Sequence, residues 1–241
     1  FVYGPARMER VAYRGDLHRS ALDTPLVALG LPAFLGAFAA AVRTEARRFR
    51  PSLVHAHWWI PGGALAALGA DAPLVVTSHG SDVRLLDGHR LWRAAAARVF
   101  GRAARVTTVS RFLARDLAAA FPALADRIVV TPMPVDVAHF AAGRATPRAV
   151  PPRILYAGNL LESKGLDDLL DAFARLRARG VACTLRLLGE GPHRDALRAR
   201  AAALGVADGV EWSDFVPQTR MPAEYGASTV TVLPTRGRAE G

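Results

Sequence analysis

Lysine is nearly absent from this 241-residue sequence, although the sequence is strongly basic. Its 31 basic side chains are 30 arginines and one lysine, Lys164, against 21 acidic side chains, so the formal charge is +10. Lys164 stands between a short apolar run and a segment with helical spacing. The Lys164 loop is therefore the first candidate site, and a single exposed lysine on a surface turn is the alternative.

Cysteine is equally scarce, because Cys183 is alone. A single thiol excludes an internal disulfide in this sequence and favours a reducing compartment. The hydrophobic fraction of 51% excludes a disordered chain and allows a sizeable core. A charge of +10 is compatible with nucleic acid, an anionic membrane or phosphorylated substrates. The arginines are scattered and form no basic block, so we expect no nucleic-acid partner.

Charge is missing altogether from residues 25–42. Eighteen uncharged residues reach the lower limit for a membrane span, but two prolines and two glycines make this a poor one. We expect a buried or membrane-surface helix instead. No signal peptide is visible. The sequence begins with Phe1 and stops just after a strand-like run, so we expect a fragment cut at both ends.

Strand-like and helix-like segments alternate without hairpin signals, which predicts α/β architecture with parallel sheets. Before a Pro-rich stretch we expect strands at 53–57, 74–78, 106–109 and 128–131, and helices at 33–49, 62–68, 91–104 and 111–121. We take residues 141–152 as a linker. Beyond it we expect strands at 153–157, 184–188, 209–212 and 229–233, and helices at 165–179, 193–204 and 220–226. The pattern predicts two Rossmann-like domains facing a cleft, residues 1–145 and 146–241.

Ligands of open parallel sheets bind beyond the carboxyl ends of the strands, and two histidine motifs stand there. His55 and His57 share one face of a predicted strand. They are candidate metal ligands, but no Asp, Glu or Cys stands at ligand spacing nearby, so we favour packing or cleft lining and expect no metal. Gly80 lets the chain turn sharply and leaves His79 and Asp82 at the mouth of the sheet.

The simplest interpretation of that second motif is an ordinary turn with Asp82 as a helix cap. A hydrolase triad is disfavoured, because no serine lies in a Gly-x-Ser-x-Gly elbow.

Two further loops point to phosphate chemistry. Lys164 lies at the start of a predicted helix, where the dipole disfavours a cation unless an anion is also bound. Gly158 permits a tight turn before it. The turn Gly189-Glu190-Gly191-Pro192 follows another strand, but it matches a dinucleotide fingerprint only loosely, because the third glycine is missing.

Together these segments resemble the family 4 glycosyltransferases. Ile154–Gly165 resembles the family's Gly-Arg-Leu-x-x-x-Lys-Gly segment, and Leu187–Pro192 resembles its Gly-x-Gly-Pro turn. Further segments follow the family's order and spacing: Val54–His57, His79–Asp82, Val109–Ser110, Pro132–Asp136 and Pro234–Gly241. The resemblance covers roughly residues 50–241, and the ordered combination is much more specific than any one motif.

The resemblance implies a GT-B fold and a retaining, metal-independent transfer from a nucleotide-sugar, with no other cofactor. By motif match, Lys164 would hold the donor diphosphate and neutralise the leaving group. His79 would lie near the sugar and Glu240 would contact its hydroxyls. The nucleotide pocket would include Gly158, Asn159, Gly189, Glu190 and Gly191.

Three positions depart from the family pattern. Asn159 stands where the family has an arginine, which removes half of a two-cation phosphate clamp. Met133-Pro134 replaces Asn-Gly in a turn. The family's second glutamate and closing helix would lie beyond Gly241, so the second domain is expected to be incomplete.

The leading hypothesis is a cytoplasmic glycosyltransferase of the hexosyltransferase type. The basic charge and the apolar residues 25–42 favour a lipid-linked or cell-envelope glycan acceptor and an anionic membrane surface as partner, at its inner face. The alternative is a non-catalytic nucleotide-binding module of the same fold, which Asn159 favours.

Overall fold

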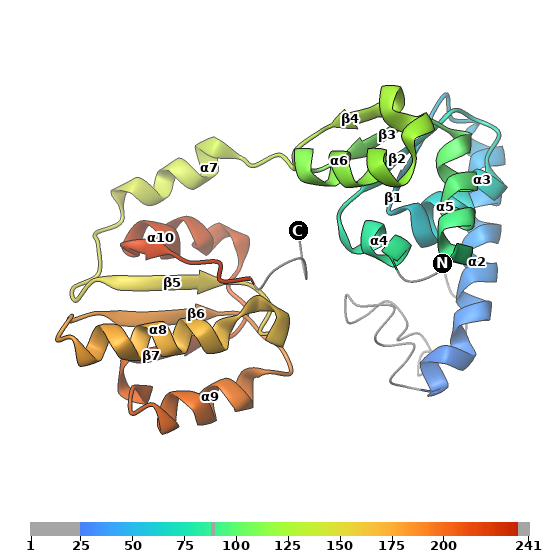
Figure 1. The fold of residues 1–241 in the computed structure, drawn as a ribbon. Helices are drawn as coiled ribbons and strands as arrows, with labels where there is room; N and C mark the ends of the chain where they lie inside the picture. The colour runs from blue at the N-terminus through green and yellow to red at the C-terminus, as the bar shows by residue number, and fades with distance from the viewer. Residues whose placement is uncertain (1–24, 88–89, 236–241) are drawn as a thin grey trace. The chain divides into compact units, whose positions relative to one another are not determined.

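The computed structural model describes residues 25–87 and 90–235, which form two compact units (Figure 1). The described residues up to Met133 belong to the first unit and those from Pro134 to the second. Among the described residues, each unit contains one four-stranded sheet, and all of the strand pairs in it are parallel. The predicted α/β class with two parallel sheets is therefore confirmed.

The sheet of the first unit has the strand order β1-β2-β3-β4. Its strands are β1 (Val54–His57), β2 (Leu74–Ser78), β3 (Ala103–Thr108) and β4 (Ile128–Val130). Its helices are α2 (Pro25–Phe49), α3 (Ala64–Gly69), α4 (Ser81–Arg84), α5 (Arg90–Arg102) and α6 (Arg111–Ala120). The core joins Val76 and Val106 of the sheet to Phe100 and Leu117 of the helices, all fully buried.

Helix α2 begins at Pro25, earlier than predicted, and contains Pro32. Its last turn carries Arg47 and Arg48, where the helix dipole favours cations. Among the described helices, α2 included, none is both long and apolar enough to cross a membrane.

The sheet of the second unit has the order β7-β6-β5-β8. Its strands are β5 (Arg153–Ala157), β6 (Thr184–Leu188), β7 (Val210–Ser213) and β8 (Val230–Thr231). Its helices are α7 (Val137–Ala141), α8 (Leu166–Ala178), α9 (Arg194–Ala203) and α10 (Met221–Ala227). The strand order reverses at β5, which has β6 on one side and β8 on the other.

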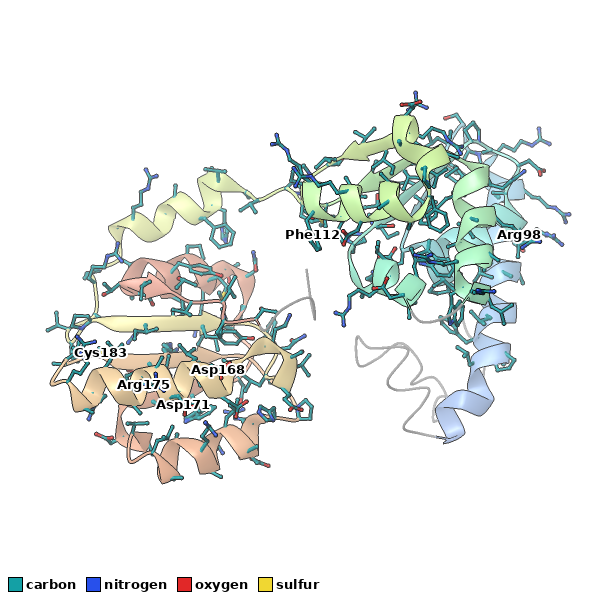
Figure 2. All side chains as sticks on the ribbon, in the orientation of Figure 1. Arg98, Phe112, Asp168, Asp171, Arg175 and Cys183 are labelled. Carbon is teal, nitrogen blue, oxygen red and sulfur yellow. The ribbon has the colours of Figure 1, made fainter. Side chains whose placement is uncertain are left out.

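The two faces of this second sheet differ in chemistry. One face packs Tyr156, Leu185 and Leu187 against the buried side of α8 and α9, and the lone thiol of Cys183 is buried in the same core (Figure 2). Successive side chains of a strand point to opposite faces of the sheet, so the alternate residues form the other face. That face includes ionic side chains.

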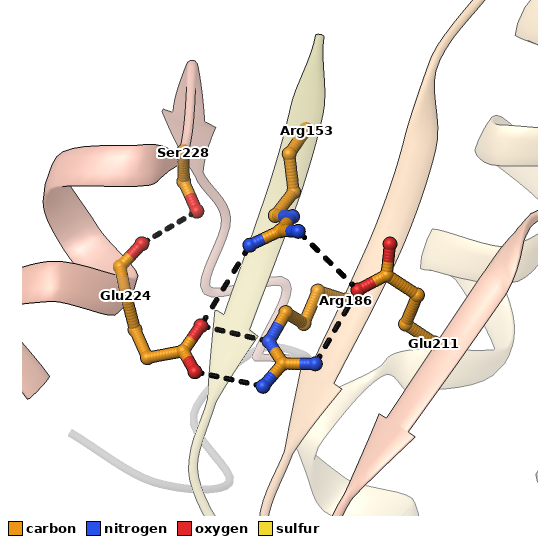
Figure 3. Close-up of polar contacts among 5 residues, drawn as sticks. All are labelled: Arg153, Arg186, Glu211, Glu224 and Ser228. Atoms are coloured by element: carbon orange, nitrogen blue, oxygen red, sulfur yellow. Dashed lines mark hydrogen bonds and ion pairs between the residues drawn. The ribbon is translucent and has the colours of Figure 1, made fainter. Parts of the chain in front are cut away.

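Four ionic side chains meet on that second face (Figure 3). Arg186 binds both carboxylate oxygens of Glu224, on α10, at 2.7 Å each. Arg186 also lies 3.3 Å from Glu211, and Arg153 lies 3.5 Å from the same carboxylate. The ion pairs therefore help to fix α10 to this face of the sheet, which also contains the buried Leu155.

The stretch predicted as a linker, residues 141–152, is partly helical. Helix α7 continues into a short 3-10 turn, Ala142–Ala145, that packs against α10. A Cβ on Gly143 would lie 2.1 Å from the carbonyl oxygen of Pro222, and the rings of Phe140 and Tyr225 are 5.8 Å apart. A helix of five residues is too short to show a hydrophobic period in the sequence. Its formation depends on packing against α10.

Candidate functional site

The carboxyl edge of the first sheet brings three histidines together. Nδ1 of His57, the last residue of β1, lies 2.8 Å from Nε2 of His79, which directly follows β2. The rings of His55 and His57 are 4.6 Å apart, and Nε2 of His55 lies 2.7 Å from the hydroxyl of Thr77. His55 and His57 thus lie on one strand face, as predicted, and His57 is hydrogen-bonded to His79.

Asp82 anchors the turn that carries His79. Asp82 is 2% exposed, and its carboxylate accepts hydrogen bonds from the backbone N–H groups of His79, at 3.0 Å, and Gly80, at 3.1 Å. The other carboxylate oxygen accepts from the N–H of Trp59 at 3.1 Å, and the Trp59 indole donates to the Asp82 carbonyl at 2.6 Å.

Gly80, at φ +117°, is the residue that caps α4, and its conformation is one that side-chain-bearing residues avoid. The side chain of Asp82 therefore holds the backbone before the helix, and it does not act as the helix cap.

Burial and charge lower the pKa values of two imidazoles in this cluster, those of His55 and His79. Burial lowers the pKa of His79, and the neighbouring His57 lowers it further, whereas Asp82 opposes the shift. Burial and His57 lower the pKa of His55 in the same way. Within the described ranges, no group of three or more His, Cys, Asp or Glu side chains could hold a metal ion.

The second candidate loop follows β5, where the strand order of the second sheet reverses. Crevices at such reversals are the usual ligand sites of open parallel sheets. Gly158 and Asn159 follow β5 directly and are exposed. Lys164 ends a 3-10 turn, Glu162–Lys164, and Gly165, at φ +67°, connects it to α8. Lys164 is thus held just before a helix N-terminus, as predicted.

This loop and the loop after β6 are joined through their backbones. The N–H of Gly158 donates to Leu188 at 2.9 Å, and that of Leu160 donates to Glu190 at 2.8 Å. The approach excludes side chains: a Cβ on Gly189 would lie 2.0 Å from the oxygen of Gly158, and one on Gly191 would lie 2.2 Å from that of Leu160. Both glycines are therefore needed for close packing.

One side-chain contact reinforces the junction, and it was absent from the sequence prediction. Nε2 of His193 lies 2.9 Å from the carboxylate of Asp167, in the first turn of α8, and the N–H of His193 donates to Leu160 at 3.1 Å. The available signals were a histidine directly after the Gly-x-Gly-Pro turn and a carboxylate three residues after Lys164. Neither signal indicates that these two side chains are in contact.

The predicted site residues therefore fall into two groups. His79 belongs to the first unit, and one edge of the second unit gathers the remaining ones that are described: Gly158, Asn159, Lys164, Gly189, Glu190 and Gly191. Glu240 lies outside the described residues.

Two family models together match nearly the whole chain. Residues 2–139 match Glycosyltransferase Family 4, and residues 144–241 match Glycosyl transferases group 1. The chain belongs to the family 4 glycosyltransferases, as its motifs predicted.

Curated relatives agree with this assignment. The D-inositol 3-phosphate glycosyltransferase of Acidothermus cellulolyticus is 34% identical over 251 residues, covering 90% of this chain and 55% of the relative. The GDP-mannose-dependent alpha-(1-6)-phosphatidylinositol monomannoside mannosyltransferase of Mycolicibacterium smegmatis is 31% identical, covering 74% and 48%. The chain thus spans about half the length of these relatives.

Solved structures show the same fold at low identity. The sucrose-phosphate synthase of Thermosynechococcus elongatus is 19% identical with a TM-score of 0.63, over 86% of this chain and 55% of that one. Anabaena HepE, solved in complex with UDP, is 18% identical with a TM-score of 0.63, over 87% and 59%. The two sheets are those of a GT-B glycosyltransferase, which confirms the predicted fold.

Proposed function

We propose that the complete protein transfers a sugar from a nucleotide-sugar donor with retention of configuration and without a metal ion. The junction of the two loops after β5 and β6 carries the proposal. At this junction the two loops approach so closely that only glycine fits at Gly189 and Gly191. Lys164 lies beside a helix N-terminus where the strand order reverses. A cation and free backbone N–H groups at such a place suit a diphosphate.

In this proposal the residues have separate tasks. Lys164 neutralises the negative charge that develops on the leaving nucleoside diphosphate. The nucleotide is contacted by Gly158, Asn159 and the turn Gly189–Gly191. Within that turn, the side chain of Glu190 is exposed. His79 contacts the sugar, and Glu240 binds its hydroxyls.

The acceptor we propose is a lipid-linked or cell-envelope glycan at the inner face of a membrane. The name of the Mycolicibacterium smegmatis relative includes phosphatidylinositol monomannoside, a lipid-linked sugar, and describes the enzyme as GDP-mannose-dependent. The exposed basic end of α2, with Arg47 and Arg48, suits an anionic surface.

Replacing Lys164 tests the donor role. Lys164→Ala in the complete protein should lower kcat/KM for sugar transfer about 100-fold, as expected for the loss of one charge at the leaving group. The readout is product formation from a panel of sugar nucleotides, with donor binding measured by calorimetry. Arg179→Ala is the matched control, because it removes an exposed cation just beyond the far end of α8. Unchanged transfer in Lys164→Ala would refute the assigned role.

A non-catalytic nucleotide-binding module is the second candidate, favoured by Asn159 in place of the family's arginine. It predicts tight binding of a nucleoside diphosphate by the complete protein and no turnover with any donor and acceptor pair. Turnover with any pair eliminates it.

A further inference from the structure

The first sheet and the turn after β2 hold His57 and His79 close together. β1 and β2 are parallel, with His57 opposite Thr77, so the end of β1 lies beside the residues that follow β2. The backbone of His79 is held by the buried carboxylate of Asp82. The 2.8 Å separation of the two ring nitrogens therefore joins two positions that the sheet and Asp82 both hold.

Such a contact links the protonation of the two rings. A hydrogen bond between two ring nitrogens needs a hydrogen on one and a bare lone pair on the other. If Nε2 of His79 donates to Nδ1 of His57, both neutral rings hold their hydrogen on Nε2, the form that free imidazole side chains prefer in water. Nδ1 of His79 is then bare, and it is the ring atom left for a ligand while the contact with His57 lasts.

We propose that His57 is a positioning residue, which fixes the tautomer and ring orientation of His79 so that Nδ1 of His79 accepts a hydrogen bond from a hydroxyl of the donor sugar. The inference rests on the proposed function, because it assumes His79 at the sugar. Choosing which ring nitrogen carries the proton through a bond to the other nitrogen is a general use of histidine.

The surroundings of His79 lower its pKa and so favour its neutral form. His79 is faced by His57 and His55 of β1 and by Asp82 of α4, and the ring of Trp58 lies 5.4 Å from it. The cationic forms of the two histidines oppose a further proton, and Asp82 favours it. A further proton on His79 would occupy Nδ1, the atom that must stay bare to accept a hydrogen bond from the ligand.

Nitrogen NMR of the complete protein, labelled with 15N-histidine, tests the geometry without any turnover. The His79 signals should show a hydrogen on Nε2 alone at neutral pH. His57→Ala should give a mixture of tautomers and a higher His79 pKa. His57→Asn, whose amide oxygen can accept the same bond, should restore the single tautomer. His55→Ala is the matched control, because it removes a neighbour on the same strand face and keeps the His57 contact.

A His79 tautomer that is identical in the wild type and in His57→Ala would overturn the proposal. So would a restored tautomer in His57→Asn without recovery of transfer.

Transfer kinetics complete the test. His57→Ala should lower kcat about tenfold, the effect of one hydrogen bond, and leave the donor KM nearly unchanged. His57→Asn should recover most of that loss. A wild-type protein that binds donor but transfers nothing would contradict the proposed function, while the NMR result would still decide the role of His57.

Discussion

The carboxyl edge of the first sheet is built from side chains, whereas that of the second is built from backbone. In the first, the buried carboxylate of Asp82 holds the His79 turn, and imidazoles face outward. In the second, Gly189 and Gly191 let two loops meet through carbonyl and N–H groups. The first edge depends on one buried carboxylate, and the second tolerates almost no added volume.

Removing the Asp82 carboxylate should have the largest effect on stability. Asp82→Ala leaves the N–H groups of His79, Gly80 and Trp59 without their acceptor, which should cost about 4 kcal/mol in the free energy of unfolding of the first unit. Denaturant unfolding measures it, with exposed Asp116→Ala as a control expected within about 0.5 kcal/mol of wild type. A loss as small as the control's would show that the turn does not need its anchor.

Adding one methyl group at the second edge should rank next. In Gly191→Ala the new Cβ meets the carbonyl oxygen of Leu160, so the two loops must separate, at a cost of about 3 kcal/mol and with loss of donor binding. Gly101→Ala is the matched control, since nothing lies within 4 Å of the new atom. Normal donor affinity in Gly191→Ala would break the comparison between the two edges.

The ionic face under α10 gives a smaller effect. Arg186→Ala removes both bonds to Glu224, whose side chain is 17% exposed, and should destabilise the second unit by about 2 kcal/mol. Arg177→Ala breaks an ion pair with Asp208, which is 70% exposed, and should cost less than about 0.5 kcal/mol. Equal losses of stability in the two variants would mean that burial does not determine how much an ion pair contributes.

Mild acid should produce the smallest effect, through the histidine cluster of the first unit. The folded pKa values of His55 and His79 lie below the ordinary 6.5, so below that pH the unfolded chain binds protons that the folded chain does not. Stability should therefore fall as the pH drops from about 6.5 through the folded pKa values. Unfolding of the double variant His55→Gln, His79→Gln should show a shallower slope between pH 7 and 5, and an unchanged slope would contradict the shifts.

Much of the fold was predictable because local patterns agree with tertiary packing. The strands at 74–78, 153–157 and 184–188 match β2, β5 and β6 to the residue, because each is an apolar run bounded by turn residues. The helix α7 was missed, since five residues carry no period and its packing on α10 stabilises it. The compact units divide between Met133 and Pro134, so residues 134–145 group with the second unit.

The candidate site was predictable as a set of loops and much less as a set of contacts. Residue type and position after a strand pointed to His79, Lys164 and the glycine turn. The partners that hold them come from elsewhere in the chain: His57 lies 22 residues before His79, and Asp167 lies 26 residues before His193. No local pattern carries that information.

The sequence by itself determined the alternation of strands and helices, the glycines at the loops and the single lysine, because backbone preference and hydrophobic period are local properties. The tertiary structure alone decided that Asp82 anchors a turn and that His57 faces His79. It also decided that Gly191 lies against Leu160. These contacts depend on the register and order of parallel strands, which are set by burial of whole faces and by crossovers between distant segments.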